Sequence, residues 1–175
     1  MKEKKSLADA LGVRAFALFK QRKMAIFFIF CVMLGVCLQI TNGFANPFLQ
    51  SFEKMPEYAD AFGVRHANAL ISLSQLSETF CLLLIPFALR RLGIKYVMLI
   101  AMLCWVLRFG LFGLGNPGDG VWMFVLSMLV YGVAFDFFNI SGSLFVNQET
   151  DLSVRSSAQG LFMMMTYGFG ATIGT

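Results

Sequence analysis

The sequence contains five long segments of almost wholly apolar residues, and these segments limit the possible fold more than any other feature. They lie at about residues 24–43, 67–89, 96–114, 121–146 and 158–175. Each has close to or more than the ~20 residues that a helix needs to cross the ~30 Å hydrocarbon core of a bilayer. The segments are too long and too uniformly apolar for barrel strands, and helices are the other structure that satisfies its backbone inside lipid. We therefore predict an all-α membrane protein with five transmembrane helices.

The composition argues against most other classes of protein. Of the 175 residues, 58% are hydrophobic and only 14% are charged, whereas a soluble domain has roughly 25% charged residues. The four cysteines lie inside the apolar segments without CxxC spacing, and the sequence has one histidine, so we expect neither a metal site nor a cofactor. No phosphate-binding loop, zinc-protease motif or nucleophile elbow occurs, so we expect no enzyme.

The distribution of basic residues predicts the orientation in the membrane. Seven of the 14 Lys and Arg residues precede Met24, and the loops at 90–95 and 147–157 add four on the same side. The loop at 44–66, on the opposite side, has two. Because cytoplasmic loops are enriched in Lys and Arg, the N-terminus is predicted to be cytoplasmic. No basic patch that would bind nucleic acid is apparent elsewhere.

Residues 1–23 are predicted to be a cytoplasmic linker, and 24–175 a transmembrane bundle. Within the linker, four apolar residues recur at helical spacing beside basic ones: Leu7, Leu11, Leu18 and Phe19. This stretch is either a short helix on the inner membrane surface or a plain linker.

Three ionisable residues lie inside the apolar segments: Glu78, Arg108 and Asp136. An ionisable side chain at the bilayer centre costs roughly 2.5–3.5 kcal/mol on insertion scales, so each needs a reason. Arg108 lies near the outer end of the 96–114 segment, and we expect its side chain to extend from a lipid-facing helix to the membrane surface.

Polar residues occur as pairs one helical turn apart in three of the first four segments. The pairs are Gln39 with Asn42, Gln75 with Glu78, and Asp136 with Asn139. Residues at this spacing share a helix face. We expect the first, second and fourth segments to surround a polar cavity, while the third faces lipid. The alternative is that these side chains only join the helices by hydrogen bonds.

Two further features concern packing. Tyr131 and Phe135 lie near Asp136 and are either core residues or an aromatic wall of the cavity. The last segment has a GxxxG spacing at Gly170 and Gly174, which favours close contact with another helix. Because the apolar pattern continues to Thr175, we expect a truncated protein from which the neighbouring helix is missing.

Several motifs resemble the nucleoside:proton symporter family of the major facilitator superfamily. They are LQITN at 38–42, SQLSET at 74–79 and AFDFFNISGS at 134–143, within similar stretches at 15–49, 72–86, 131–143 and 157–170. The resemblance implies a twelve-helix fold of two six-helix halves, in which these segments are the seventh to eleventh helices. The N-terminal half and the twelfth helix would then be missing partners.

The resemblance also implies an activity and a site. The activity is proton-coupled nucleoside uptake across the bacterial inner membrane by alternating access. The implied substrate-binding residues are Gln39, Asn42, Gln75, Glu78, Phe135 and Asp136, with Tyr131 a weaker match. Glu78 or Asp136 would carry the proton, and we favour Asp136 because Phe135 beside it could link proton binding to the bound base.

The chemistry of these residue types suits a nucleoside. Amides offer a donor and an acceptor to a base edge, carboxylates accept hydrogen bonds from ribose hydroxyls, and an aromatic face stacks on a base with roughly 1–3 kcal/mol. A carboxyl group in a low-dielectric medium binds a proton more readily than one in water. Two alternatives remain: a superfamily transporter for a sugar or another polar solute, and a membrane-embedded enzyme or non-transporting subunit.

Overall fold

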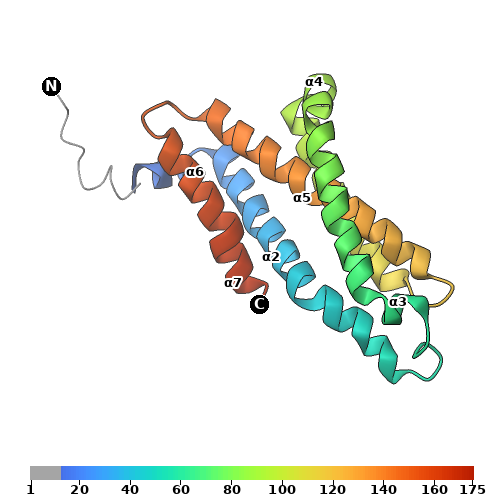
Figure 1. Ribbon diagram of the computed structural model, residues 1–175. Helices are drawn as coiled ribbons and strands as arrows, with labels where there is room; N and C mark the ends of the chain where they lie inside the picture. The colour runs from blue at the N-terminus through green and yellow to red at the C-terminus, as the bar shows by residue number, and fades with distance from the viewer. Residues whose placement is uncertain (1–12) are drawn as a thin grey trace. The chain divides into compact units, whose positions relative to one another are not determined.

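The computed structural model describes residues 13–175, and all regular structure in that range is helical (Figure 1). The elements are η1 (Val13–Lys20), α2 (Arg22–Ser51), η2 (Phe52–Lys54), α3 (Phe62–Arg65), α4 (Ala67–Leu114), α5 (Val121–Glu149), α6 (Arg155–Met163), η3 (Met164–Gly170) and α7 (Ala171–Ile173). Two of them, η1 and η2, are 3₁₀ helices, and η3 is a π-helix. The all-α prediction is confirmed for the described residues.

Three helical stretches within residues 13–175 are long and apolar enough to cross a membrane: Arg22–Lys54, Ala67–Leu114 and Val121–Glu149. Helix α4 has 48 residues, but Gly93 inside it has non-helical angles, φ 76° and ψ 166°. This break lies between the predicted 67–89 and 96–114 segments. The predicted 158–175 segment is formed by α6, η3 and α7, which follow one another without a gap.

Helix α2 is longer than the apolar pattern predicted. The first segment was expected to end near Gly43, whereas the helix continues through Pro47 to Ser51. The reason is packing, because Leu49 is fully buried in a core cluster formed with Ala67, Leu70, Phe124 and Met128.

The helices divide into two compact units, which we describe separately. The first contains the described residues 13–39 together with 143–175, and the second contains 40–142. In the first unit, the side-chain amide nitrogen of Gln159 donates hydrogen bonds to the Ser143 carbonyl at 2.7 Å and to Asn147 Oδ1 at 2.9 Å. Lys23 at the start of α2 also forms an ion pair with Glu149 at the end of α5.

Glycines bring the last helical segment close to α2 in the first unit. A Cβ atom on Gly170 would lie 2.7 Å from the Cα of Gly35, and one on Gly174 would lie 2.8 Å from the Val36 carbonyl oxygen. The close contact predicted from the GxxxG spacing is therefore present. The partner in this contact is α2, a helix of the chain itself, and not a missing helix.

The proposed surface helix at 7–19 lies partly outside the described residues. Its described part belongs to η1, which packs against α6. Leu18 is buried whereas Phe19 is exposed, so these two side chains do not share one buried face. Whether this segment lies on a membrane surface stays a prediction.

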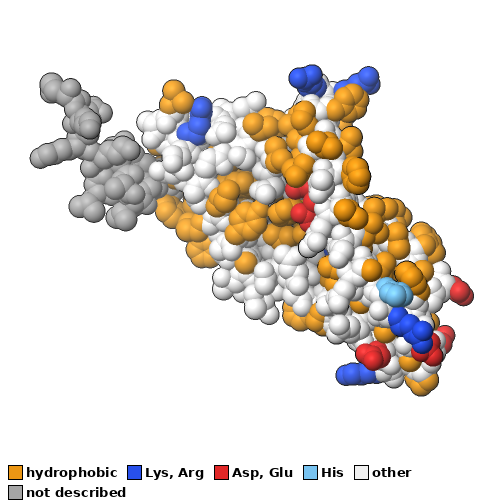
Figure 2. Space-filling view, viewed as in Figure 1, with side chains coloured by type: hydrophobic (Ala, Val, Ile, Leu, Met, Phe, Trp, Pro, Cys, Tyr) orange, Lys and Arg blue, Asp and Glu red, His pale blue; other side chains and the backbone are white. Residues whose placement is uncertain are grey.

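The second unit has the features of a membrane bundle. Figure 2 shows Lys and Arg side chains at the top of the view, where α4 breaks near its middle, and charges of both signs at the opposite end of this unit, with hydrophobic side chains between them. Large apolar side chains along α4 are exposed, as lipid contact requires: Phe80, Leu83, Phe87, Leu103 and Val106. Asn116 orders the short turn before α5, because its Oδ1 accepts hydrogen bonds from the Gly118 and Gly120 amides.

Candidate functional site

The second unit contains a cavity of about 300 Å³ with a mixed polar and apolar lining. It lies among α2, α4 and α5, and its polar side chains come from all three helices. The lining residues are Thr41, Asn42, Ala45, Asn46, Asn68, Ile71, Ser74, Gln75, Glu78, Arg108, Met128 and Tyr131. We call this space the polar pocket.

Close contact between α4 and α5 positions Glu78 in the polar pocket. The Ser77 hydroxyl donates a hydrogen bond to the Leu129 carbonyl. Opposite it, Gly132 approaches so closely that a Cβ atom there would lie 2.6 Å from the Ser77 carbonyl carbon. With no side chain at 132, the first half of α4 packs on α5, and the next residue, Glu78, lies against the pocket.

Four of the seven predicted binding residues line the polar pocket: Asn42, Gln75, Glu78 and Tyr131. Gln75 and Asn42 are exposed, Glu78 is half-buried, and Tyr131 is buried. The predicted sharing of a face by Gln75 and Glu78 therefore brings both into one cavity. Gln39 belongs to the first unit and not to the second, which contains this pocket.

Phe135 and Asp136 are on α5 but do not line the polar pocket. The ring of Phe135 stacks on that of Tyr131, with centroids 5.9 Å apart and planes 3° from parallel. Phe135 therefore contacts Tyr131, which lines the pocket, and lies behind it. Asp136 is 6% exposed, and its Oδ2 atom has no hydrogen-bond partner among the described residues.

Arg108 corrects the expectation of a lipid-facing third segment. Its side chain is 2% exposed and lines the polar pocket, so it does not extend to the membrane surface. The guanidinium donates a hydrogen bond to the Ser127 carbonyl at 2.8 Å. The second half of α4 thus turns at least one polar side chain toward α2 and α5.

Two asparagines of the polar pocket were not predicted. Asn46 Nδ2 donates a hydrogen bond to Asn68 Oδ1 at 3.2 Å, which joins α2 to the first turn of α4. Asn46 follows Asn42 by four residues and so continues the same polar face. That spacing was visible in the sequence, but the predicted end of the first helix at Gly43 concealed it.

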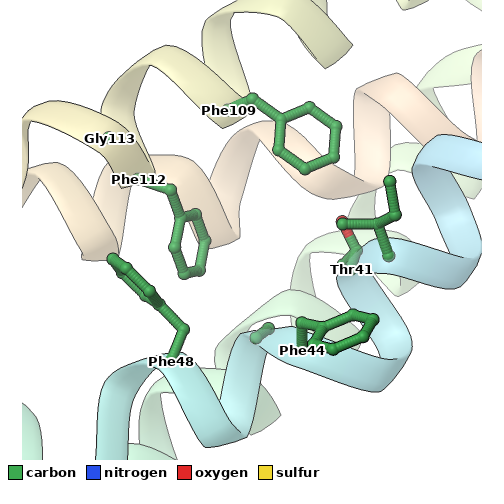
Figure 3. A pocket seen from close by; sticks show the side chains of 8 residues that line it. Thr41, Phe44, Phe48, Phe109, Phe112 and Gly113 are labelled. Carbon is green, nitrogen blue, oxygen red and sulfur yellow. The ribbon is translucent and has the colours of Figure 1, made fainter. Parts of the chain in front are cut away.

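A second cavity, of about 270 Å³, adjoins the polar pocket, and its surface is almost wholly apolar. Figure 3 shows the rings of Phe44 and Phe48 on α2, and those of Phe109 and Phe112 on α4, around this aromatic pocket. Its other lining residues are Ile40, Thr41, Ala45 and Gly113. Thr41 and Ala45 line both pockets and so form part of the wall between them.

Among the described residues, no group of three or more His, Cys, Asp or Glu side chains is placed to hold a metal ion. The polar side-chain groups that line the polar pocket are amides, hydroxyls, one carboxylate, one guanidinium and one phenol. Such a set can form hydrogen bonds with a polar solute and present an aromatic surface to it.

Comparisons with known proteins agree with the family resemblance. The sequence model of a family described as nucleoside H+ symporter matches residues 1–175. The chain is 57% identical to the xanthosine permease of Escherichia coli (strain K12) over 97% of its own length and 41% of the permease. It is 56% identical to the nucleoside permease NupG of the same organism, with the same two shares of length.

The fold also matches a solved structure. A crystal structure of a mutant of the nucleoside transporter NupG superposes with a TM-score of 0.92 at 54% identity, over 99% of this chain and 44% of that one. The chain thus spans about two fifths of the length of the curated relatives it matches.

Proposed function

The chain belongs to the nucleoside H+ symporter family, and we propose that it supplies part of the C-terminal half of a proton-coupled nucleoside transporter. The complete transporter would take up nucleosides across the bacterial inner membrane by alternating access. The N-terminus of this chain would be cytoplasmic. The lipid bilayer, an N-terminal half and a twelfth helix would be its partners.

The observation that carries this proposal is the polar pocket. Two predicted amides, Asn42 and Gln75, line it together with a carboxylate, Glu78, and an aromatic ring, Tyr131. In our proposal the amides bind the base edge, Glu78 accepts hydrogen bonds from ribose hydroxyls, and Tyr131 contacts the base. Gln39 would complete the amide set; this assignment rests on the family resemblance.

The proton would bind to Asp136 or Glu78, and we favour Asp136. One oxygen of this buried carboxylate lacks a hydrogen-bond partner among the described residues. Burying a carboxylate charge without partners is costly, and binding a proton removes the charge. Phe135 adjoins Asp136 and stacks on Tyr131, which connects the proton site to the aromatic wall of the pocket.

We further propose that the chain crosses the membrane five times, as the seventh to eleventh helices of the fold. At ~1.5 Å per residue, a straight helix of the length of α4 would be about 72 Å long, more than twice the hydrocarbon thickness. The break at Gly93 supports two spans, 67–89 and 96–114. Residues 158–175 would be the fifth span.

An uptake experiment tests the proposed function. The complete transporter is expressed in cells that lack nucleoside uptake, and accumulation of radiolabelled uridine and adenosine is measured with and without a proton gradient. Gradient-dependent accumulation that excess nucleoside reduces, and excess sugar does not, is expected. If excess sugar reduces accumulation and excess nucleoside does not, the protein is a sugar transporter. If neither labelled nucleoside accumulates, the protein is a non-transporting subunit.

A further inference from the structure

Arg108 connects the three helices that surround the polar pocket. From α4, its Nη1 atom donates to the Ser127 carbonyl of α5 at 2.8 Å, and Nε lies 3.5 Å from Thr41 Oγ1 of α2. The Ser127 hydroxyl returns a hydrogen bond to the Arg108 carbonyl at 3.1 Å. These contacts fix the guanidinium in the wall of the polar pocket.

The charge of Arg108 is unusual in this position. Arginine does not lose its proton in proteins, so this buried side chain keeps a positive charge. No carboxylate forms an ion pair with it among residues 13–175. The Glu78 carboxylate, which lines the same pocket, attracts this charge without forming an ion pair with it. Burying such a charge is expensive inside a membrane protein, and such residues commonly have a role in function.

The charge also lies against aromatic rings. The guanidinium carbon lies 4.4 Å from the centroid of the Tyr131 ring and 5.4 Å from that of Phe112. An arginine over an aromatic face is held by attraction to the ring, and the attraction is strongest where water is excluded. Tyr131 also meets Trp105 edge-on at 5.9 Å and stacks on Phe135.

We propose that Arg108 is a positioning residue of the nucleoside site, which acts by fixing the ring of Tyr131 as a wall of the polar pocket. This inference rests on the proposed function. The hydrogen bonds to Ser127 and Thr41 set the place of the guanidinium, and the guanidinium sets the place of the ring. Loss of Arg108 frees the ring to take other orientations, so less of the site is preformed when the nucleoside arrives.

A double-mutant cycle separates action through Tyr131 from independent action. The complete transporter is purified in lipid nanodiscs, and binding of tritiated uridine and adenosine is measured for Arg108→Met, Tyr131→Leu and the double variant. Arg108→Lys, which keeps the charge but not the planar guanidinium, serves as the conservative variant. Arg91→Met is the matched control, because Arg91 lies 5.5 Å from the ring of Phe87, away from both pockets.

We expect Arg108→Met to lower nucleoside affinity about tenfold when Tyr131 is present, and less than about twofold when Tyr131 is already leucine. Arg108→Lys should restore part of the loss, and Arg91→Met should bind like the unmodified transporter. An equal loss in both Tyr131 backgrounds, or no loss in either, would overturn the inference.

Three further outcomes keep the test decisive. If Arg108→Met does not fold, Arg108→Lys takes its place in the cycle: a loss only in the presence of Tyr131 supports the inference, and an equal loss in both backgrounds overturns it. If the unmodified transporter binds neither nucleoside, the proposed function fails, and the inference fails with it. If it binds and Arg108 variants bind equally well, only the inference fails.

Discussion

Replacing Gly132 with alanine would insert a methyl group into a close contact between α4 and α5. The new Cβ atom would lie 2.6 Å from the Ser77 carbonyl carbon and 2.7 Å from the Glu78 amide nitrogen. Both are backbone atoms of α4, so no side chain can rotate away to make room. The two helices must separate at this point, and the backbone that carries Glu78 must move with them.

The size of the effect follows from three contributions. Inserting a methyl group into a well-packed contact costs ~1–3 kcal/mol. Helix separation would also stretch the hydrogen bond from Ser77 to the Leu129 carbonyl, which contributes ~0.5–1.5 kcal/mol. Alanine in a helix is favoured over glycine by ~1 kcal/mol, which offsets part of this. We expect a net destabilisation of about 1–3 kcal/mol, together with weaker nucleoside binding.

Thermal unfolding of the purified complete transporter, followed by intrinsic fluorescence, measures the change in stability. Gly110→Ala is the matched control, since Gly110 is also helical but no neighbouring atom lies within 4 Å of the place that a Cβ atom would take there. Its Tm should stay the same or rise, whereas that of Gly132→Ala should fall by several degrees. Equal Tm values for the two variants would refute the argument from helix contact.

Four other substitutions test the pocket, the proton site and the break in α4. Gln75→Ala should weaken nucleoside binding, measured by calorimetry, about tenfold, because a buried polar group of the substrate would lose its hydrogen-bond partner at a cost of ~1–3 kcal/mol. Unchanged affinity would mean that this amide has a purely structural role. Asp136→Asn should abolish gradient-driven accumulation of nucleoside in proteoliposomes but keep nucleoside exchange. Glu78→Gln should still accumulate nucleoside. If Asp136→Asn accumulates nucleoside, Asp136 is not the obligatory proton carrier. Gly93→Ala should lower the Tm. The φ angle there is 76°, so alanine would strain the backbone by ~1–3 kcal/mol even though no atom obstructs its side chain. A Tm equal to that of the unmodified transporter would contradict this.

The sequence was a good guide to properties that each helix has by itself. Apolar length predicted helices because lipid offers the backbone no hydrogen bonds. One-turn spacing correctly brought Gln75 and Glu78 into one cavity, since i and i+3 residues share a face in any helix. The GxxxG spacing predicted a close contact, which Gly170 makes with Gly35. The motifs were also sufficient to predict the family.

Tertiary structure decided which faces meet. The sequence gives the position of Arg108 along its helix but not the direction in which that helix is turned, so a residue predicted to reach the membrane surface is instead buried against Tyr131. The same limitation hid the pairing of Asn46 with Asn68, which depends on where α2 ends and what packs against its last turns. Hydropathy and spacing describe one helix at a time, whereas the lining of a pocket depends on the rotation of several helices, and packing between them sets that rotation.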